Sequence, residues 1–427
     1  MDRIAIVDGV RTPFVKVYTD FNDLEAYDLG RIVAIELIQK TEFDKNLIDE
    51  VIFGCVANSS DAANMARVVL LLAGIPERKR AMTVSRNCAS GIESVTSGAE
   101  KIMTGAAQVV LAGGAESMSN IPLYYQKHVQ NIFVALGRSK TLWTRLSQFF
   151  RLNPRLLLSP RVGLELGLTD PVCGVNMGIT AENIAKDFGI SRKEQDAFSL
   201  MSHQRAAAGL ERLKEEMVPV YVKDEYNTVI DRDNGVRENQ TMDALAKLRP
   251  YFDRKSGSVT AGNSSQITDG ASVILMMKEK QAKSLGYTPL GYLRAYAYEG
   301  LDPSRMGLGP AYAIPTALDK AGCSLKDIQL IEINEAFAAQ VIACVRALES
   351  KTFCSEKLGR REAVGEINRE ILNVNGGSIA LGHPVGSTGN RLILTLLKEM
   401  KRRGLGLGMV SLCVGGGQGA AVILERE

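Results

Sequence analysis

The sequence is poor in the residues that hold metal ions and disulfide frameworks. Among 427 residues there are seven cysteines and three histidines, and no Cys-x-x-Cys pair occurs. These counts argue against a zinc site, a histidine-rich metal site and a disulfide scaffold. We therefore expect no bound metal, and reduced thiols of an intracellular protein.

Other signals are missing as well. The net charge of +3 is too small to favour nucleic acid, and no zinc-finger or RNA-binding signature occurs. No apolar run is long enough to span a bilayer. No charged segment with a following apolar core precedes the first strand-like residues, 4–7, so we expect no secretory signal and a cytoplasmic location.

What is present is a long alternation of two kinds of segment. In the first half, strand-like and helical segments alternate: strands at 4–7, 50–55, 82–84 and 108–112, helices at 24–40, 64–72 and 90–104. In the second half, strands are expected at 290–296, 327–333, 371–374 and 409–413, and helices at 315–321, 336–348 and 389–402. This alternation predicts an α/β fold, a parallel or mixed sheet covered by helices.

Local similarity indicates that the second half repeats the first. Residues 37–53 resemble 318–333, and 110–114 resemble 412–416, in the same order. Two such matches favour a duplicated fold with halves at 1–278 and 279–427. Cys88 and His383 then lie in related strand-to-helix regions, and pseudo-symmetric halves would bring them together.

Between the halves, residues of about 121–255 break the pattern and are expected to form an inserted loop domain. Its first part, 121–161, has two lysines, five arginines and no carboxylate. Within 138–152, four large apolar residues share one helical face: Leu142, Leu146, Phe149 and Phe150. A basic amphipathic helix fits peripheral contact with an anionic membrane or docking on a partner. The alternative is a helix that packs on its own protein.

Three short strings carry the chemistry: Asn87-Cys88-Ala89-Ser90-Gly91, Gly382-His383-Pro384 and Cys413-Val414-Gly415-Gly416-Gly417. Together they supply two thiols, an imidazole and glycine-rich backbone, which acyl transfer through a thioester requires. Each string by itself also fits a structural role, since a buried cysteine is usually a small apolar filler. Finding all three favours an enzyme.

In this order the strings resemble the thiolase family, that of 3-ketoacyl-CoA thiolases and acetyl-CoA acyltransferases. The resemblance runs from Arg11-Thr12-Pro13-Phe14 to the Cys413 string, and it includes 177–183, 247–250 and 260–265. It implies a duplicated αβαβα layered fold. The basic insertion after Pro122 further resembles the thiolase (β) subunit of the fatty-acid β-oxidation trifunctional complex. That subunit usually has a histidine where this chain has Asn334.

The resemblance also implies a role for each catalytic candidate. Cys88, activated by His383, attacks the 3-keto carbon of a 3-oxoacyl-CoA and keeps the acyl group. Cys413 protonates the departing acetyl-CoA enolate and later deprotonates CoA. The thioester oxygen lies against the backbone N–H groups of Cys88 and Gly415, and the enolate oxygen faces His383 and a water held by Asn334.

The same resemblance suggests how substrates and partners bind. Met177 and Ser265 would line the pantetheine tunnel, with Phe337 near the acyl group. CoA is a substrate, so no cofactor is expected. The expected assembly is a homodimer or tetramer, with a β-oxidation hydratase/dehydrogenase subunit as a candidate partner.

Three alternatives stay open at this point. A biosynthetic acetoacetyl-CoA thiolase differs only in chain length, and the roomy insertion favours longer chains. A decarboxylating ketoacyl synthase needs a second catalytic histidine, which the Asn334 position does not offer. A non-catalytic acyl-CoA or lipid-binding protein would bind its ligand without turnover.

Overall fold

A mixed sheet of ten strands runs through the body of the molecule. The computed structural model describes residues 2–222 and 227–427. Nine strands follow one another across the sheet: β12 (Leu330–Ile333), β13 (Leu407–Val414), β14 (Gln418–Glu425), β11 (Gly291–Gly300), β1 (Ile4–Arg11), β10 (Thr268–Lys278), β5 (Val109–Glu116), β3 (Glu50–Gly54) and β4 (Arg80–Val84). The short strand β2 (Val15–Lys16) pairs with β10.

The two halves of this sheet have the same plan. In the first, β3 pairs in parallel with β4 and β5, and β10 pairs antiparallel with β5 and β1. In the second, β12 pairs in parallel with β13 and, through one bridge, with Leu372; β14 pairs antiparallel with β13 and β11. An antiparallel pairing of β1 with β11 joins the halves. The matching order and direction confirm the predicted duplicated α/β fold.

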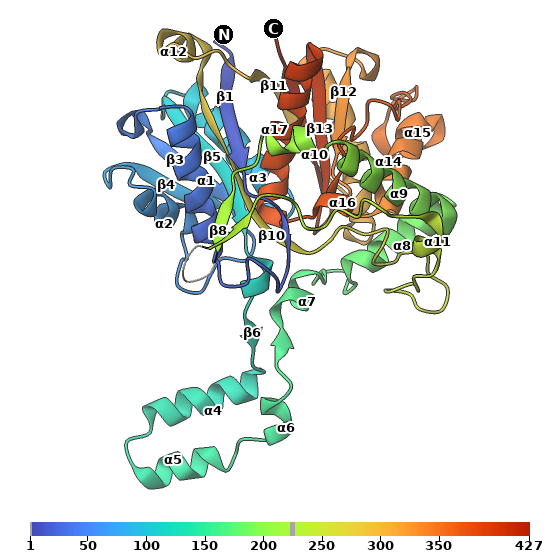
Figure 1. Ribbon diagram of the computed structural model, residues 1–427. Coiled ribbons are helices and arrows are strands. Elements are labelled where there is room, and N and C mark those ends of the chain that lie inside the picture. Colours follow the sequence, from blue (N-terminus) through green and yellow to red (C-terminus); the bar gives the residue numbers. More distant parts are fainter. Residues whose placement is uncertain (1, 223–226) are drawn as a thin grey trace.

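Helices lie in three layers around the halves. The outer layers are α1 (Ala26–Lys40) with α2 (Met65–Leu72) and α13 (Gly309–Ala321) with α14 (Ala338–Glu349); the middle layer is α3 (Ser90–Met103) with α17 (Val385–Arg403). Strand alternation produces this layering: in β5, Val109 and Leu111 pack toward the outer helices, whereas Val110 and Ala112 pack toward the middle ones. In Figure 1, α3 and α17 lie in the middle of the body.

The region 121–255 covers one end of the body and sends out an arm. Its elements are β6 (Leu123–Tyr124), α4 (Lys127–Arg138), α5 (Leu142–Phe149), α6 (Pro154–Leu157), β7 (Arg161–Val162), α7 (Gly163–Gly167), α8 (Met177–Asp187), α9 (Arg192–Ala208), α10 (Leu210–Lys214), β8 (Val220–Val222), β9 (Thr228–Ile230) and α11 (Met242–Ala246). The arm, residues 123–162, begins with the β6–β7 pair and carries α4 to α6 away from the body (Figure 1). The domain limits stay a prediction.

Three short helices complete the second half: α12 (Glu279–Ser284), α15 (Lys351–Leu358) and α16 (Ser378–Leu381). None of the helices in the described part of the chain is both long and apolar enough to cross a membrane.

Several predicted boundaries are wrong for identifiable reasons. Helix α13 begins six residues before the predicted start at Pro315, because Pro310 occupies the first turn, where proline is favoured. Residues 371–374 form a single bridge rather than a strand. There Asn373 has φ +47°, and its side chain bonds both backbone groups of Ile333 in place of a strand partner. The strands β10 and β14 were not predicted at all.

Candidate active site

The N-termini of α3 and α17 touch, and this contact brings the two halves together at one place. A Cβ atom on Gly91 would lie 2.6 Å from the backbone nitrogen of Asn390, and one on Gly389 would lie 2.7 Å from that of Ile92. Only glycine allows so close an approach of two helices. Cys88 lies two residues before α3, and His383 lies two residues before α17.

Cys88 lies in a tight turn between β4 and α3. The turn includes Asn87 at φ +44°, and the Ser90 hydroxyl closes it by accepting from the Arg86 N–H at 2.9 Å and donating to the Asn87 carbonyl at 2.7 Å. Burial raises the pKa of the Cys88 thiol, while the N–H groups of Gly415 and of Cys88 itself oppose that rise. The two predicted oxyanion donors therefore both lie against this sulfur.

Cys413 comes from the end of β13 and approaches Cys88 from the other half. Its thiol is buried, and burial followed by the neighbouring thiols of Cys88 and Cys344 raises its pKa well above the usual range. The Asn87 side chain donates to the Gly415 carbonyl at 2.7 Å and so ties the two cysteine loops to each other. The structure thus places the two predicted thiols side by side, with both protonated at rest.

The His383 ring is held in one orientation and one tautomer. Its Nδ1 lies 2.7 Å from the Thr388 hydroxyl, which itself donates to the Pro384 carbonyl at 2.9 Å. Since the hydroxyl has only one hydrogen, it accepts from Nδ1–H, and Nε2 keeps its lone pair. Burial, together with the charge of Arg391, lowers the pKa of His383 to about 3. The imidazole is therefore neutral and able to accept a proton.

Asn334 follows β12 and contacts the other ring nitrogen. Its Nδ2 lies 3.4 Å from His383 Nε2, and its Oδ1 accepts from the Ser378 hydroxyl at 2.6 Å. Glu335 does not cap α14, but its carboxylate accepts the Ile379 N–H at 3.2 Å in the first turn of α16. Its carboxylate is buried and accepts from the Ser202 hydroxyl at 2.6 Å, and α14 begins three residues later.

The three predicted substrate-binding residues lie near the Cys413 loop. Phe337 packs with Cys413, Met177 and Phe252, and its ring meets that of Phe252 edge-on at 6.1 Å. Met177 Sδ lies 3.5 Å from the place where a Cβ on Gly415 would stand. Ser265 donates its backbone N–H to the Ala336 carbonyl at 2.9 Å, which holds it beside Phe337.

Three neighbours of the site were not predicted. Thr388 and Ser378 lie in the same glycine-rich stretch as His383, so hydroxyl residues in that stretch were the available signal. Arg391 had no such signal, because nothing in its local sequence separates it from a solvated surface arginine. It is fully buried and lies 3.5 Å from Glu332, whose pKa burial raises to about 8.

Comparison with known proteins agrees with this geometry. Models of the thiolase N-terminal and C-terminal domains match residues 4–280 and 287–426. This chain belongs to the thiolase family. The resemblance predicted from the sequence is thereby confirmed.

The thiolase chain is similar to several named relatives over its whole length. It is 45% identical to the 3-ketoacyl-CoA thiolase of Yersinia enterocolitica, with 100% of this chain and 97% of that protein covered. Human mitochondrial 3-ketoacyl-CoA thiolase superimposes with a TM-score of 0.86 at 36% identity, with 100% and 99% of the chains covered. The acetyl-CoA acetyltransferase of Bacillus anthracis gives the same values. The human enzyme has also been solved in complex with CoA.

Proposed function

We propose that this thiolase cleaves 3-oxoacyl-CoA with CoA, giving acetyl-CoA and a shortened acyl-CoA, in fatty-acid β-oxidation. The reaction is reversible as a Claisen condensation. One observation carries the proposal: the touching N-termini of α3 and α17 gather two protonated thiols, Cys88 and Cys413, and a neutral imidazole whose Nε2 keeps its lone pair at one place.

In the first half-reaction, Cys88 Sγ bonds to the 3-keto carbon and its proton passes to His383 Nε2. The bond between carbons 2 and 3 breaks, and its electron pair forms the acetyl-CoA enolate. Cys413 protonates that enolate and becomes a thiolate. Two N–H groups, those of Cys88 and Gly415, face the acyl oxygen, and preorganised donors of this kind are worth roughly 10²–10³-fold each.

In the second half-reaction, the Cys413 thiolate removes the thiol proton of CoA. The CoA sulfur attacks the acyl carbon, the bond to Cys88 breaks, and the expelled thiolate recovers its proton from His383. Every proton in these steps is carried by this chain's own side chains, and CoA enters as a substrate. Asn334 serves the enolate oxygen through a held water, because its amide N–H₂ can donate beside His383.

Steady-state thiolysis over a series of 3-oxoacyl-CoA chain lengths tests this function. We expect turnover that rises from acetoacetyl-CoA to longer chains. Turnover of acetoacetyl-CoA alone would favour the biosynthetic thiolase. Ligand binding without turnover would favour a non-catalytic protein, and decarboxylation of a malonyl thioester would favour a ketoacyl synthase.

We further propose that the arm makes peripheral contact with an anionic membrane. Its large apolar side chains face solvent rather than the body: Trp143 is 83% exposed and Phe150 82%. The predicted alternative, a helix packed on its own protein, would have buried them. Residues 121–161 hold seven basic side chains and no carboxylate, which suits an anionic surface.

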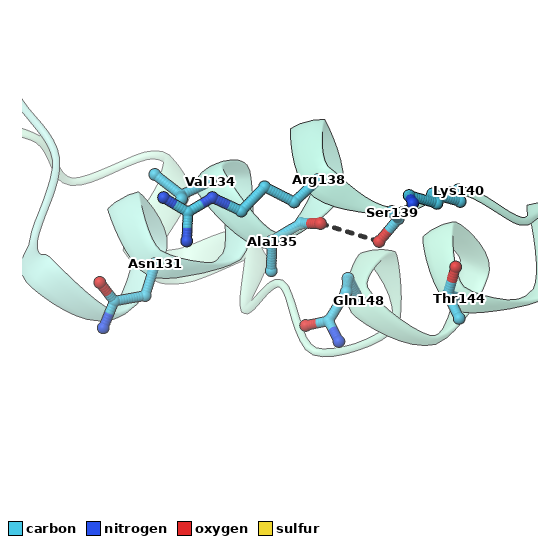
Figure 2. Close-up of a pocket in the computed structure, with 8 residues that line it drawn as sticks. All are labelled: Asn131, Val134, Ala135, Arg138, Ser139, Lys140, Thr144 and Gln148. Carbon is cyan, nitrogen blue, oxygen red and sulfur yellow. Dashed lines mark hydrogen bonds between the residues drawn. The ribbon is translucent and has the colours of Figure 1, made fainter.

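A shallow, open hollow of about 610 Å³ lies between α4 and α5, and Arg138, Lys140 and Thr144 are among its lining residues (Figure 2). Beside this hollow, the Ser139 hydroxyl donates a hydrogen bond to the Ala135 carbonyl at 2.8 Å. The guanidinium group of Arg138 and the ammonium group of Lys140 beside this hollow can together receive a lipid phosphate.

Sedimentation with vesicles tests the membrane contact. We expect binding to phosphatidylglycerol vesicles and not to phosphatidylcholine ones, with loss of binding in Trp143→Ser/Phe150→Ser. The control Leu71→Ser removes an apolar side chain that is 47% exposed on α2 of the body, and should bind as wild type does. Failure to bind vesicles, with co-purification of a hydratase/dehydrogenase that the arm variant loses, would make the arm a subunit interface instead.

We also propose a cytoplasmic homodimer or tetramer. All seven cysteines are free thiols, which suits a reducing compartment. In the part of the chain that the structure describes, no strand covers the outer edge of β4, and such an edge can pair with a second copy. Light scattering after size-exclusion chromatography would give the mass of the assembly; a monomer would contradict the proposal.

A further inference from the structure

Behind the imidazole, Asn334 continues into a chain of polar contacts whose other members, Ser378 and Arg391, take no part in the catalytic steps. Arg391 Nη2 lies 3.3 Å from the Ser378 hydroxyl, and that hydroxyl lies 2.6 Å from Asn334 Oδ1. All three residues are fully buried. The contacts join a helix of the middle layer to the loop that follows β12, and they end beside His383 Nε2.

The direction of each hydrogen bond in this chain follows from the chemistry of its ends. A guanidinium can only donate, so the Ser378 oxygen accepts from Arg391 and turns its single hydrogen toward Asn334. The amide of Asn334 must then present its carbonyl oxygen to Ser378 and its N–H₂ to the imidazole. From the other end, Thr388 leaves the lone pair on Nε2. Followed from either end, the chain therefore places an N–H₂ donor of Asn334 opposite the lone pair on His383 Nε2.

We propose that Ser378 is a positioning residue that, under the charge of Arg391, fixes which end of the Asn334 amide faces the imidazole. This role rests on the proposed thiolysis. Without the hydroxyl, the amide can turn by 180° and set its oxygen against the Nε2 lone pair. That orientation repels the lone pair and withdraws the donor that serves the enolate oxygen. Ser378 itself touches neither substrate nor thiol in this scheme.

Kinetics of Ser378→Ala, alone and combined with Asn334→Ala, test the proposal. We expect kcat for thiolysis to fall about tenfold, equivalent to about 1.4 kcal/mol, with KM for CoA unchanged within about twofold. In the Asn334→Ala background, the same substitution should have less than about a twofold further effect, because the amide it orients is absent. Ser378→Thr keeps the hydroxyl and should restore most of the activity.

A matched control is Ser199→Ala, which removes an equally buried hydroxyl whose hydrogen bond stays within α9, to the Gln195 carbonyl at 2.9 Å. It should leave kcat unchanged. If Ser378→Ala also leaves kcat unchanged, or if its effect is fully additive with Asn334→Ala, the positioning role is wrong. Absence of thiolysis in the wild type would instead overturn the proposed function. If Ser378→Ala does not fold, Ser378→Cys, with its weaker donor, should still lower kcat.

Discussion

The two strand-to-helix junctions that meet at the site have the same place in the fold but are built differently. From β4 to α3 the chain takes one short turn, and Cys88 is half-buried at its tip. From Leu372 to α17 the chain makes a longer glycine-rich path that includes α16, and His383 is only 7% exposed. In the proposed mechanism, Cys88 as nucleophile must meet a bulky CoA thioester, whereas His383 as base needs a dry, fixed surrounding. Duplication therefore supplied two equivalent positions, and local chain length adapted each to one task.

The ends of β5 and β13 show the same division. β5 ends in Glu116, whose buried carboxylate accepts the N–H groups of Ala57 at 2.8 Å and Gly386 at 2.9 Å, so it anchors the first turn of α17. At the equivalent end of β13 lies Cys413, with a free thiol. At each pair of corresponding chain segments, the two halves contribute different chemistry to one site.

The largest effect is expected when the proposed nucleophile is removed from the junction between β4 and α3. Cys88→Ser keeps the shape of the turn but replaces the thiol by a far less acidic hydroxyl. We expect turnover to fall by about 10⁴-fold or more, since loss of a nucleophile disables the whole catalytic unit. Thiolysis assays with long-chain 3-oxoacyl-CoA measure the loss. Activity within tenfold of wild type would assign the nucleophile elsewhere.

Cys413→Ala separates the two thiols. We expect Cys88 to remain acylatable by acyl-CoA, while condensation and thiolysis fall by about 10²–10⁴-fold because the acid–base group is gone. Mass spectrometry of the acyl-enzyme and steady-state rates report the two effects separately. Condensation at the wild-type rate would show that Cys413 is not the base.

Thr388→Val, a nearly isosteric change, tests the junction between Leu372 and α17, which carries His383. It leaves the buried Nδ1–H of His383 without its acceptor, which costs roughly 1–3 kcal/mol, so kcat should fall about tenfold or more. If Thr388 acts by fixing the tautomer of His383, its loss should lower kcat and leave KM unchanged. Thr388→Ser keeps the hydroxyl and should behave as wild type; an equal loss in both variants would exclude this role.

The smallest effect concerns stability against acid. His383 and His203 are buried with pKa values lowered to about 3 and about 4, below the ordinary 6.5 of the unfolded chain. Between pH 6.5 and these lowered pKa values, the unfolded state binds more protons than the folded state. The stability that is fully present above pH 6.5 is therefore lost as the pH falls. Lowering the pH from 6.5 to 5.5 should cost roughly 1 kcal/mol of unfolding free energy for each histidine.

Urea unfolding at the two pH values measures this cost. His203→Gln should remove about half of the histidine contribution. If the unfolding free energy of the wild type does not fall from pH 6.5 to 5.5, these two imidazole rings are not buried as described.

Sequence patterns were sufficient for the α/β class and for the duplication, because strand and helix periodicity report directly which faces are buried. They missed β10 and β14, which are buried on both faces. Cys88, His383 and Cys413 were named because their three strings, taken together and in order, resemble those of the thiolase family; each string by itself also fits a structural role. Sequence patterns did not name Arg391 or Ser378, because a buried polar network is defined by contacts between distant segments. The exposed apolar face of the arm is another such case: periodicity indicated an amphipathic helix but not whether anything covers it.

Mapping of the acyl group in a single turnover tests the central claim, that the two junctions form one catalytic site. Wild-type protein is mixed with a 3-oxoacyl-CoA in the absence of CoA and analysed by peptide mass spectrometry. The account predicts one acyl group, on Cys88, that forms far more slowly in His383→Ala. An acyl group on Cys413 or another cysteine, or formation at an unchanged rate without the imidazole, would contradict it.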